Sequence, residues 1–257
     1  MSEPAPPDTA LPDIAPAASF QPRFDPNTVE AAVFDIGGVF LYPHHNQVSG
    51  VLDAMGFDRP SDVLEYRRAH HAGVATLSAR FVEVDEYDPS FWIDYDRSYS
   101  ATLGVPEEAA AEFSSRIDKR AWDWLHEENV ASFHELHASG LPLAIVSNNS
   151  GAAPTQMLEH GVCWVNHHHD LPRVAAIIDS SLVGVAKPDP AIMAPALYAL
   201  GLPADRVVYI GDTVHADING ATAAGMQSVQ LDPFDQHTEY THTRLPDLAA
   251  LNQALGV

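Results

Sequence analysis

Four short apolar runs recur along the chain, at 31–35, 141–146, 175–178 and 207–210. None of them alternates between apolar and polar positions, and such runs are typical of strands in a parallel sheet that is covered on both faces. Helical patterns separate them, at 131–138, 190–200 and 218–224. The recurring order of strand, polar turn and helix predicts a doubly wound, Rossmann-like α/β sheet.

Polar residues stand at the ends of three of these predicted strands. Asp35 ends the first, Ser147 follows the second, and Asp212 follows the fourth after Gly211. Ligands of doubly wound sheets bind beyond the carboxyl ends of the strands. A buried carboxylate is costly unless it is paired. We therefore expect these three side chains to meet in a functional site.

The roughly 100 residues between the first and second strands have a different pattern. Helical patterns occur at 61–71, 89–103 and 106–125, and the last begins with Pro106 followed by acids, as helix starts often do. We expect an all-helical insert over 44–128 within an α/β core of 27–43 and 129–257. The insert holds eight of the 13 basic residues, which fit solvated helix faces, or one or two arginines that face an anionic substrate.

Composition supports a folded interior and limits the partners. Hydrophobic residues make up 46% of the chain, whereas residues 1–26 contain seven prolines and predict a flexible tail. A net charge of −22 disfavours nucleic acid and anionic membranes as partners, because such a surface repels their phosphates. Solubility or a salt-rich habitat is the simplest explanation of this charge.

The location predicted from the sequence is the cytoplasm. No apolar run approaches the roughly 20 residues that cross a bilayer, and the N-terminus lacks the pattern of a secretory signal. Cys163 is the only cysteine, which excludes an internal disulfide and suits a reducing compartment. A monomer and a homodimer both remain open.

Four polar motifs follow one another in a fixed order. They are Asp35 with Gly37-Gly38, then Ser147-Asn148, then Lys187 before Pro188, and then Gly211-Asp212 with Asp217 beyond. Over residues 29–232 this set resembles the haloacid dehalogenase-like hydrolase superfamily, with the helical insert where that family carries its cap. Taken singly, each residue has a plainer explanation as a helix cap, a turn residue or a surface lysine.

The resemblance implies a phosphoryl-transfer site. Asp35 would be the nucleophile and would form an aspartyl-phosphate. Mg²⁺ would be held by Asp35, the backbone carbonyl of Gly37 and Asp212, with Asp217 behind them or binding through water. Carboxylates suit this ion, which favours oxygen ligands.

The same resemblance supplies a phosphate-binding set. Ser147 and the backbone amides near it would bind phosphoryl oxygens, together with Gly38 and Asn148. Lys187 would neutralise the crowded charge of nucleophile and phosphate, as a compact point charge can do.

The first motif departs from the family pattern. Family phosphatases and mutases usually carry Asp-x-Asp, and the second acid protonates the leaving oxygen, but this chain has Gly37 there. Such acid–base help is typically worth about 10²–10⁴-fold in rate. Its absence argues against a sugar-phosphate mutase. Three explanations remain. The substrate has a good leaving group, another residue such as His44 or His45 replaces the acid, or the enzyme is weakly active.

The sequence as a whole predicts a Mg²⁺-dependent phosphatase of a small phosphorylated metabolite. A cap over the site would exclude both water and large polymers. A metal-independent 2-haloacid dehalogenase is the first alternative, but it has no use for the acids Asp212 and Asp217. A non-catalytic binding homologue is the second, and the intact Asp35, Lys187 and Asp212 speak against it.

Overall fold

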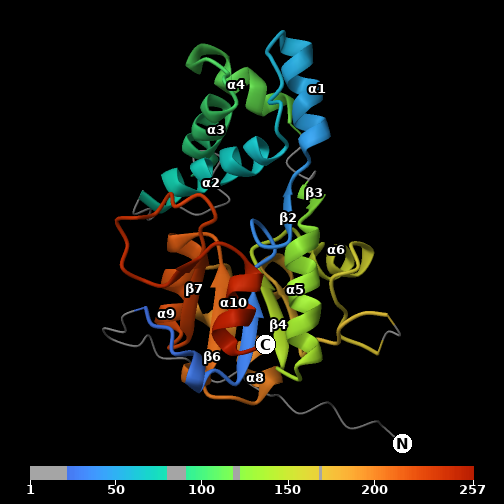
Figure 1. Ribbon diagram of the computed structural model, residues 1–257, viewed down its shortest axis with the longest axis vertical. Coiled ribbons are helices and arrows are strands. Elements are labelled where there is room, and N and C mark those ends of the chain that lie inside the picture. The colour runs from blue at the N-terminus through green and yellow to red at the C-terminus, as the bar shows by residue number, and fades with distance from the viewer. Residues whose placement is uncertain (1–21, 80–90, 118–121, 168–169) are drawn as a thin grey trace, which may run out of the picture.

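The computed structural model describes residues 22–79, 91–117, 122–167 and 170–257. A group of helices stands above an α/β core, and the chain passes between the two parts through a pair of short strands (Figure 1). None of the helices within these described ranges is both long and apolar enough to cross a membrane.

The core contains a six-stranded sheet with the order β5-β4-β1-β6-β7-β8, and all its strand pairs are parallel. The strands are β1 (Ala31–Phe34), β4 (Leu143–Ser147), β5 (Ile177–Asp179), β6 (Val207–Gly211), β7 (Gln227–Leu231) and β8 (Arg244–Leu245). β1 lies between β4 and β6, with Phe34 level with Ile145 on one side and Ile210 on the other. The predicted parallel, doubly wound sheet is confirmed, and its first four strands lie within two residues of the predicted runs.

Helices cover both faces of this sheet because successive strand residues point to opposite sides. The helices are α5 (Glu127–Ala138), α6 (Ala153–Glu159), α7 (Ser180–Val183), α8 (Ala194–Leu200), α9 (Gly220–Ala223) and α10 (Leu248–Leu255). Phe34 packs with Phe133 of α5 and Leu251 of α10 in one apolar cluster. Val33 packs in a second cluster with Ala196 of α8. The apolar runs are therefore buried on both sides.

In the described part of the cap, four helices share an apolar core of their own. They are α1 (His45–Met55), α2 (Leu64–Ala79), α3 (Phe91–Thr102) and α4 (Glu107–Arg116). Leu52, Tyr66, Tyr99 and Phe113 from these four helices share one buried cluster. The cap therefore has a hydrophobic core that is separate from the cores on the two faces of the sheet.

The junction between cap and core is a β-structure, which the sequence interpretation missed. β2 (Leu41–Pro43) and β3 (Trp122–Leu125) pair antiparallel. The helix predicted over 106–125 is wrong at its end, because α4 stops at Arg116 and Ile117 is already extended. β3 reads Trp-Asp-Trp-Leu, and large aromatic residues suit a pleated strand.

Short helical turns complete the core. They are the 3-10 helices η1 (Pro26–Thr28), η2 (Pro190–Met193) and η3 (Ala204–Arg206), and the π-helical turn η4 (Val214–Asn219). The end of the proline-rich stretch is attached to the core. The Ser228 amide donates to the Arg23 carbonyl oxygen, and the Asp25 amide donates to the Gln227 side chain. Residues 1–21 of the predicted flexible tail lie outside the described residues.

Candidate active site

Three predicted site residues meet at the carboxyl edge of the central strands. Asp35 directly follows β1, Ser147 is the last residue of β4, and Asp212 directly follows β6. Because β1 lies between β4 and β6, the three positions are neighbours. Their side chains are buried, with Asp35 7% exposed and Asp212 2% exposed. An acid cluster in such a setting requires positive charge close by.

Lys187 supplies that charge from the loop before η2. Its ammonium nitrogen lies 2.9 Å from Asp35 Oδ1 and 2.6 Å from Asp217 Oδ1, and it donates to the Tyr209 hydroxyl at 3.0 Å. Asn148 fixes the backbone of this lysine: its Oδ1 accepts from the Lys187 amide, and its Nδ2 donates to the Lys187 carbonyl. The structure thus brings Asn148 to the site as a support of Lys187.

Burial and mutual charge set the protonation of this cluster. Burial raises the pKa of Asp35 to about 6, although the Lys187 charge opposes the rise. Burial alone would lower the pKa of Lys187, but Asp217 and Asp35 outweigh it and hold that pKa well above its ordinary value. Lys187 is therefore a permanent cation beside a carboxylate that is mostly ionised at neutral pH.

Asp217 has both carboxylate oxygens engaged. Oδ1 accepts from Lys187 and from the Tyr209 hydroxyl, and Oδ2 accepts from the amide and hydroxyl of Thr213. The side chain is fully buried at the start of η4. Asp217 therefore holds Lys187 in place beside Asp35, and its place behind a metal ion stays a prediction.

The Gly37-Gly38 turn allows the acids to approach closely. Gly38 has φ +64°, and a Cβ there would lie 1.9 Å from Asp212 Oδ2, so only glycine fits. A Cβ at Gly37 would lie 3.0 Å from a ring carbon of Trp122 in β3. The space beside position 37, where the family's second acid would begin, therefore faces an aromatic ring.

The donor set fits a hard cation. Asp35, Asp212 and Asp217 each place one carboxylate oxygen within 4.8 Å of the others, and all three are buried. Burial, and then the charge of Asp217, raise the pKa of Asp212 well above its ordinary value. Because Asp217 is already engaged, Asp35 and Asp212 are the carboxylates left to hold Mg²⁺, which takes oxygen ligands. The Gly37 carbonyl stays a predicted third ligand.

A model of one known protein family covers most of this chain. The family model described as haloacid dehalogenase-like hydrolase matches residues 29–225. The chain belongs to the haloacid dehalogenase-like hydrolases.

Curated relatives of this hydrolase include named phosphatases. A phosphoserine phosphatase of Thermus thermophilus is 30% identical over 129 residues, which is 50% of this chain and 49% of that protein. Phosphatase MT3486 of Mycobacterium tuberculosis is 25% identical over 231 residues, covering 89% of this chain and 99% of that one. The chain thus spans only about half the length of the first of these two relatives.

Solved structures share the fold of this hydrolase. The magnesium-bound putative hydrolase YfnB of Bacillus subtilis superposes with a TM-score of 0.53 at 15% identity, covering 89% of this chain and 99% of that one. Proteins named as dehalogenases are also among the similar sequences and structures. The comparisons therefore establish the family and its fold but do not identify the substrate.

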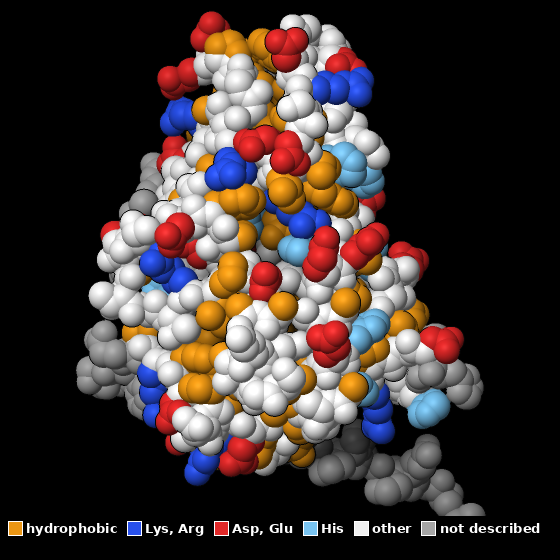
Figure 2. Space-filling view, in the orientation of Figure 1, with side chains coloured by type: hydrophobic (Ala, Val, Ile, Leu, Met, Phe, Trp, Pro, Cys, Tyr) orange, Lys and Arg blue, Asp and Glu red, His pale blue; other side chains and the backbone are white. Residues whose placement is uncertain are grey.

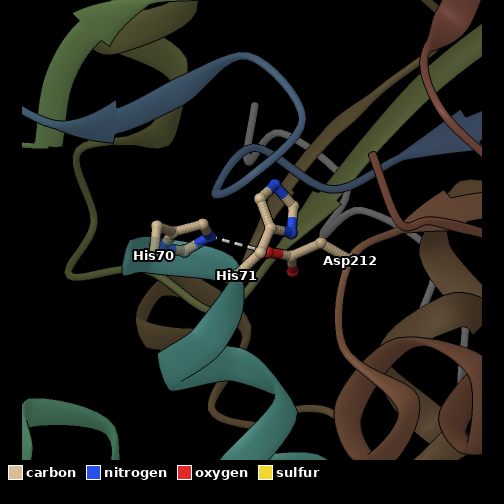
Figure 3. A group of neighbouring side chains, drawn as sticks. All are labelled: His70, His71 and Asp212. Carbon is tan, nitrogen blue, oxygen red and sulfur yellow. Dashed lines mark hydrogen bonds and ion pairs between the residues drawn. The ribbon is translucent and has the colours of Figure 1, made fainter. Parts of the chain in front are cut away.

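The cap of this hydrolase reaches into the site through α2, a feature that the sequence interpretation missed. His70 Nε2 lies 2.8 Å from Asp212 Oδ2, and His70 Nδ1 lies 2.9 Å from the Tyr95 hydroxyl (Figure 3). Burial lowers the pKa of His70 to about 3. The pair His70-His71 in a helical stretch was the available signal, but its partner Asp212 lies 142 residues further along the chain.

The histidines predicted as replacement acids lie at the start of α1. His44 caps this helix by accepting from the Asn46 amide, and the His45 ring lies 4.6 Å from the Trp124 ring. Their role as proton donors stays a prediction. The imidazole that contacts the acid cluster is that of His70.

Of the five basic cap residues that the structure describes, four form ion pairs with acids close by in the sequence. The pairs are Arg59–Asp53, Arg68–Glu65, Arg97–Asp94 and Arg116–Glu112. Arg67 differs, because its guanidinium lies 4.7 Å over the Trp124 ring at the junction, its acid partner is Glu128 of α5 at 3.9 Å, and its side chain is only 13% exposed. Figure 2 shows basic and histidine side chains beside hydrophobic ones in a hollow at this level. Arg80, Lys119 and Arg120 lie outside the described residues.

Proposed function

We propose that this hydrolase is a Mg²⁺-dependent phosphatase that acts on a small phosphorylated metabolite through an aspartyl-phosphate on Asp35. The observation that carries the proposal is the set of buried carboxylates of Asp35, Asp212 and Asp217, within 4.8 Å of one another. A cation offsets this concentration of negative charge and at the same time binds phosphoryl oxygens. Displacement of halide from carbon requires no such cation.

The chain's own residues account for both chemical steps. An oxygen of Asp35 attacks phosphorus, so a bond to Asp35 forms while the bond to the leaving oxygen breaks with its electron pair. Water then attacks the same phosphorus, the bond to Asp35 breaks, and phosphate and a proton are released. Lys187 remains charged throughout and neutralises the negative charge that gathers next to Asp35.

The Ser147 hydroxyl and a bound Mg²⁺ would both interact with the transferred phosphoryl group. Among the described residues, the Ser147 hydroxyl makes one long hydrogen bond, of 3.5 Å to the Asn148 carbonyl oxygen, and its donor could turn instead to a phosphoryl oxygen. Mg²⁺ held by Asp35 and Asp212 would supply positive charge to the transferred group.

The cap supports a small substrate. α2 reaches Asp212 through His70, and the loop after β7 meets the same helix, where the Arg68 guanidinium lies 4.5 Å over the Phe234 ring. A site covered in this way excludes polymers and water together. The named phosphatases among the relatives support the same reaction class.

The leaving group is expected to be one that departs without protonation. No acid stands at position 37, and the neighbouring Trp122 ring occupies the space beside it. Aryl and acyl phosphates release stable anions, whereas alkyl phosphates release strongly basic ones. We therefore expect aryl phosphates to be cleaved faster than alkyl phosphates of similar size.

Phosphate release from a panel of aryl and alkyl phosphates, with Mg²⁺ or with EDTA, tests the proposal. Wild-type protein should release phosphate only with Mg²⁺, and Asp35→Asn should release none. Asp123→Asn, which changes an exposed carboxylate on β3, is the matched control and should behave as wild type. Release of halide from 2-haloacids in EDTA, without phosphate release, would replace the proposal by the dehalogenase alternative. Inactivity on both panels would favour a binding role.

A further inference from the structure

A second group of potential metal ligands lies where the cap meets the core. His70 and His71 come from α2 and Asp212 from the end of β6, and one ligand atom of each lies within 4.8 Å of the others. All three side chains are buried, His71 completely. Figure 3 shows both imidazole rings beside the Asp212 carboxylate.

Hydrogen bonds fix which nitrogen of His71 carries a proton. The Tyr42 hydroxyl lies 2.8 Å from the Gly38 carbonyl oxygen, which can only accept, so the tyrosine donates its proton there. His71 Nε2 lies 3.1 Å from the same hydroxyl, and it must therefore donate to the tyrosine oxygen. Burial lowers the pKa of His71 well below its ordinary value, so the ring is neutral and Nδ1 carries a bare lone pair.

That lone pair has no partner. His71 Nδ1 is buried and makes no hydrogen bond within the described residues. Figure 3 shows the His71 ring with one nitrogen on the side of Asp212. A buried acceptor without a donor is unfavourable, by about 1–3 kcal/mol for a typical group. A cation at this point would satisfy it.

His70 is equally able to serve as a ligand. Its Nε2 points at Asp212 Oδ2, and its Nδ1 faces the Tyr95 hydroxyl, which can donate or accept. If a cation took the place of the single ring proton between Nε2 and Asp212, that proton would move to Nδ1 and be donated to the Tyr95 hydroxyl oxygen. Ligand histidines commonly donate their second nitrogen to a polar partner in this way.

We propose that His70 Nε2, His71 Nδ1 and Asp212 bind a divalent transition-metal ion that prefers imidazole, with Zn²⁺ as the representative. Two nitrogens and one carboxylate with an open position form a common zinc-binding set. Ligand atoms around tetrahedral zinc lie about 3.3 Å apart, so small side-chain shifts close the group. Mg²⁺ is a poor occupant, because it prefers oxygen ligands.

Such an ion would tie the cap to the core. It would link α2 to β6 and would take up Asp212, which is also expected to hold Mg²⁺. This consequence rests on the proposed phosphatase function: Zn²⁺ should inhibit phosphate release, and Mg²⁺ should relieve the inhibition. The binding site itself does not depend on that function.

Binding of ZnCl₂ to chelator-treated full-length protein, without substrate, tests the site. Calorimetry gives stoichiometry and affinity, and X-ray absorption of the zinc-loaded wild type gives the number of imidazole ligands. The variants are His71→Phe and, in case it unfolds, His71→Gln. His134→Gln is the matched control, because this partly buried histidine on α5 bonds to the Val162 carbonyl, away from the site. Circular dichroism verifies that each variant is folded.

The expected result is one tight zinc per chain with two imidazoles. Loss of the His71 ligand should weaken binding at least about 10-fold, since even changes to groups that support metal ligands weaken affinity about 10–100-fold. His134→Gln should bind as wild type. Asp35→Asn keeps all three ligands and should also bind zinc, which separates this test from the phosphatase test. Zinc without two imidazoles, or equal affinity in a folded His71 variant, would overturn the proposal.

Discussion

At the scale of single residues, Lys187 holds the site together. Its ammonium lies between Asp35 and Asp217, and all three side chains are buried. Removal of one partner from a buried ion group leaves an uncompensated charge and destabilises a protein by about 3–5 kcal/mol. The lysine is therefore expected to matter for folding as well as for the proposed phosphoryl transfer.

We predict that Lys187→Met lowers the free energy of unfolding by about 3–5 kcal/mol and abolishes phosphate release. Urea unfolding and the phosphate assay measure the two effects. Arg206→Met is the control, because its ion pair with Glu30 is half exposed and is worth at most about 1 kcal/mol. A folded Lys187→Met protein as stable as wild type would show that the ammonium does not compensate these acids.

Gly37 stands at the position of the family's second acid, and the space around it is restricted. The sequence shows only that the family's second acid is missing. The structure adds that a side chain at this position would begin 3.0 Å from the Trp122 ring. An acid placed there must first displace that ring.

We predict that Gly37→Asp alone gives little gain on alkyl phosphates, whereas Gly37→Asp combined with Trp122→Ala raises their turnover at least tenfold. The reason is that a general acid contributes about 10²–10⁴-fold once it can reach the leaving oxygen. The measurement is the ratio of alkyl to aryl phosphate turnover, with Trp122→Ala as the control. An equal ratio in the double variant and in Trp122→Ala would show that leaving-group protonation does not limit the rate.

At the scale of elements, α5 begins at the junction of cap and core with a partly buried histidine. His126 caps this helix and accepts from the Asn129 amide. Burial, and then the charge of Arg67, lower the pKa of His126 to about 4, against the opposing effect of Glu128. The ring is therefore neutral in the folded protein at pH values where the unfolded chain, with an ordinary pKa near 6.5, is already protonated.

We predict that His126 makes stability fall as the pH drops from about 6.5 to about 4, by up to about 3 kcal/mol. Stability falls in this direction because, as the pH drops, the unfolded state binds the proton before the folded state does. The stabilising contribution of the neutral His126 ring is therefore complete only above about pH 6.5. His126→Asn keeps a capping side chain but removes the titration. The difference in unfolding free energy between wild type and variant, measured in urea at pH 7.5 and 4.5, should shrink at the lower pH. A difference that is the same at both pH values would contradict the prediction.

Elements that the sequence predicted well are those with a uniform local pattern. β1 and β4 are continuous apolar runs, and both are completely buried. β7 escaped prediction because Gln227, Ser228 and Gln230 interrupt its apolar character, although all are buried. The side-chain amides of the two glutamines donate to distant partners, Gln230 to the Asp212 carbonyl oxygen and Gln227 to the Asp205 carbonyl oxygen. No local pattern reveals such pairings.

The residues of the site could likewise be predicted only where a local sequence pattern marks them. Asp35, Ser147, Lys187 and Asp212 follow strands or stand in a motif, so a sequence pattern exposes them. The contacts of His70 with Asp212 and of Trp122 with Gly37 join the cap to the core over long separations. These contacts depend on how the cap and the core pack against each other. The hydrophobic periodicity of the sequence does not reveal that packing.

At the scale of the whole molecule, cap and core have separate apolar interiors but several points of contact. β2 pairs with β3, His70 reaches Asp212, and the His71 ring lies 5.6 Å from the Phe234 ring of the loop after β7. Three tryptophans, Trp92, Trp122 and Trp124, pack against the cap cluster. The only cysteine, Cys163, is fully buried in the core cluster. The fourth tryptophan, Trp164, lies next to Cys163, so the two parts have separate reporters only in a Trp164→Phe background, in which the cap tryptophans report on the cap and Cys163 on the core.

We predict that cap and core unfold together, because the contacts between them are buried. Burial raises the pKa of Cys163 to about 12, so at pH 8 only about one thiol in 10⁴ is ionised, and a disulfide reagent reacts with the thiolate. In the Trp164→Phe background, labelling should therefore be negligible in the native protein and should rise in urea with the same midpoint as tryptophan fluorescence. Cys163→Ala combined with Ser150→Cys, which places the thiol at an exposed position, should react quickly without urea. A fluorescence change at lower urea than the labelling would show instead that the cap opens while the core stays folded.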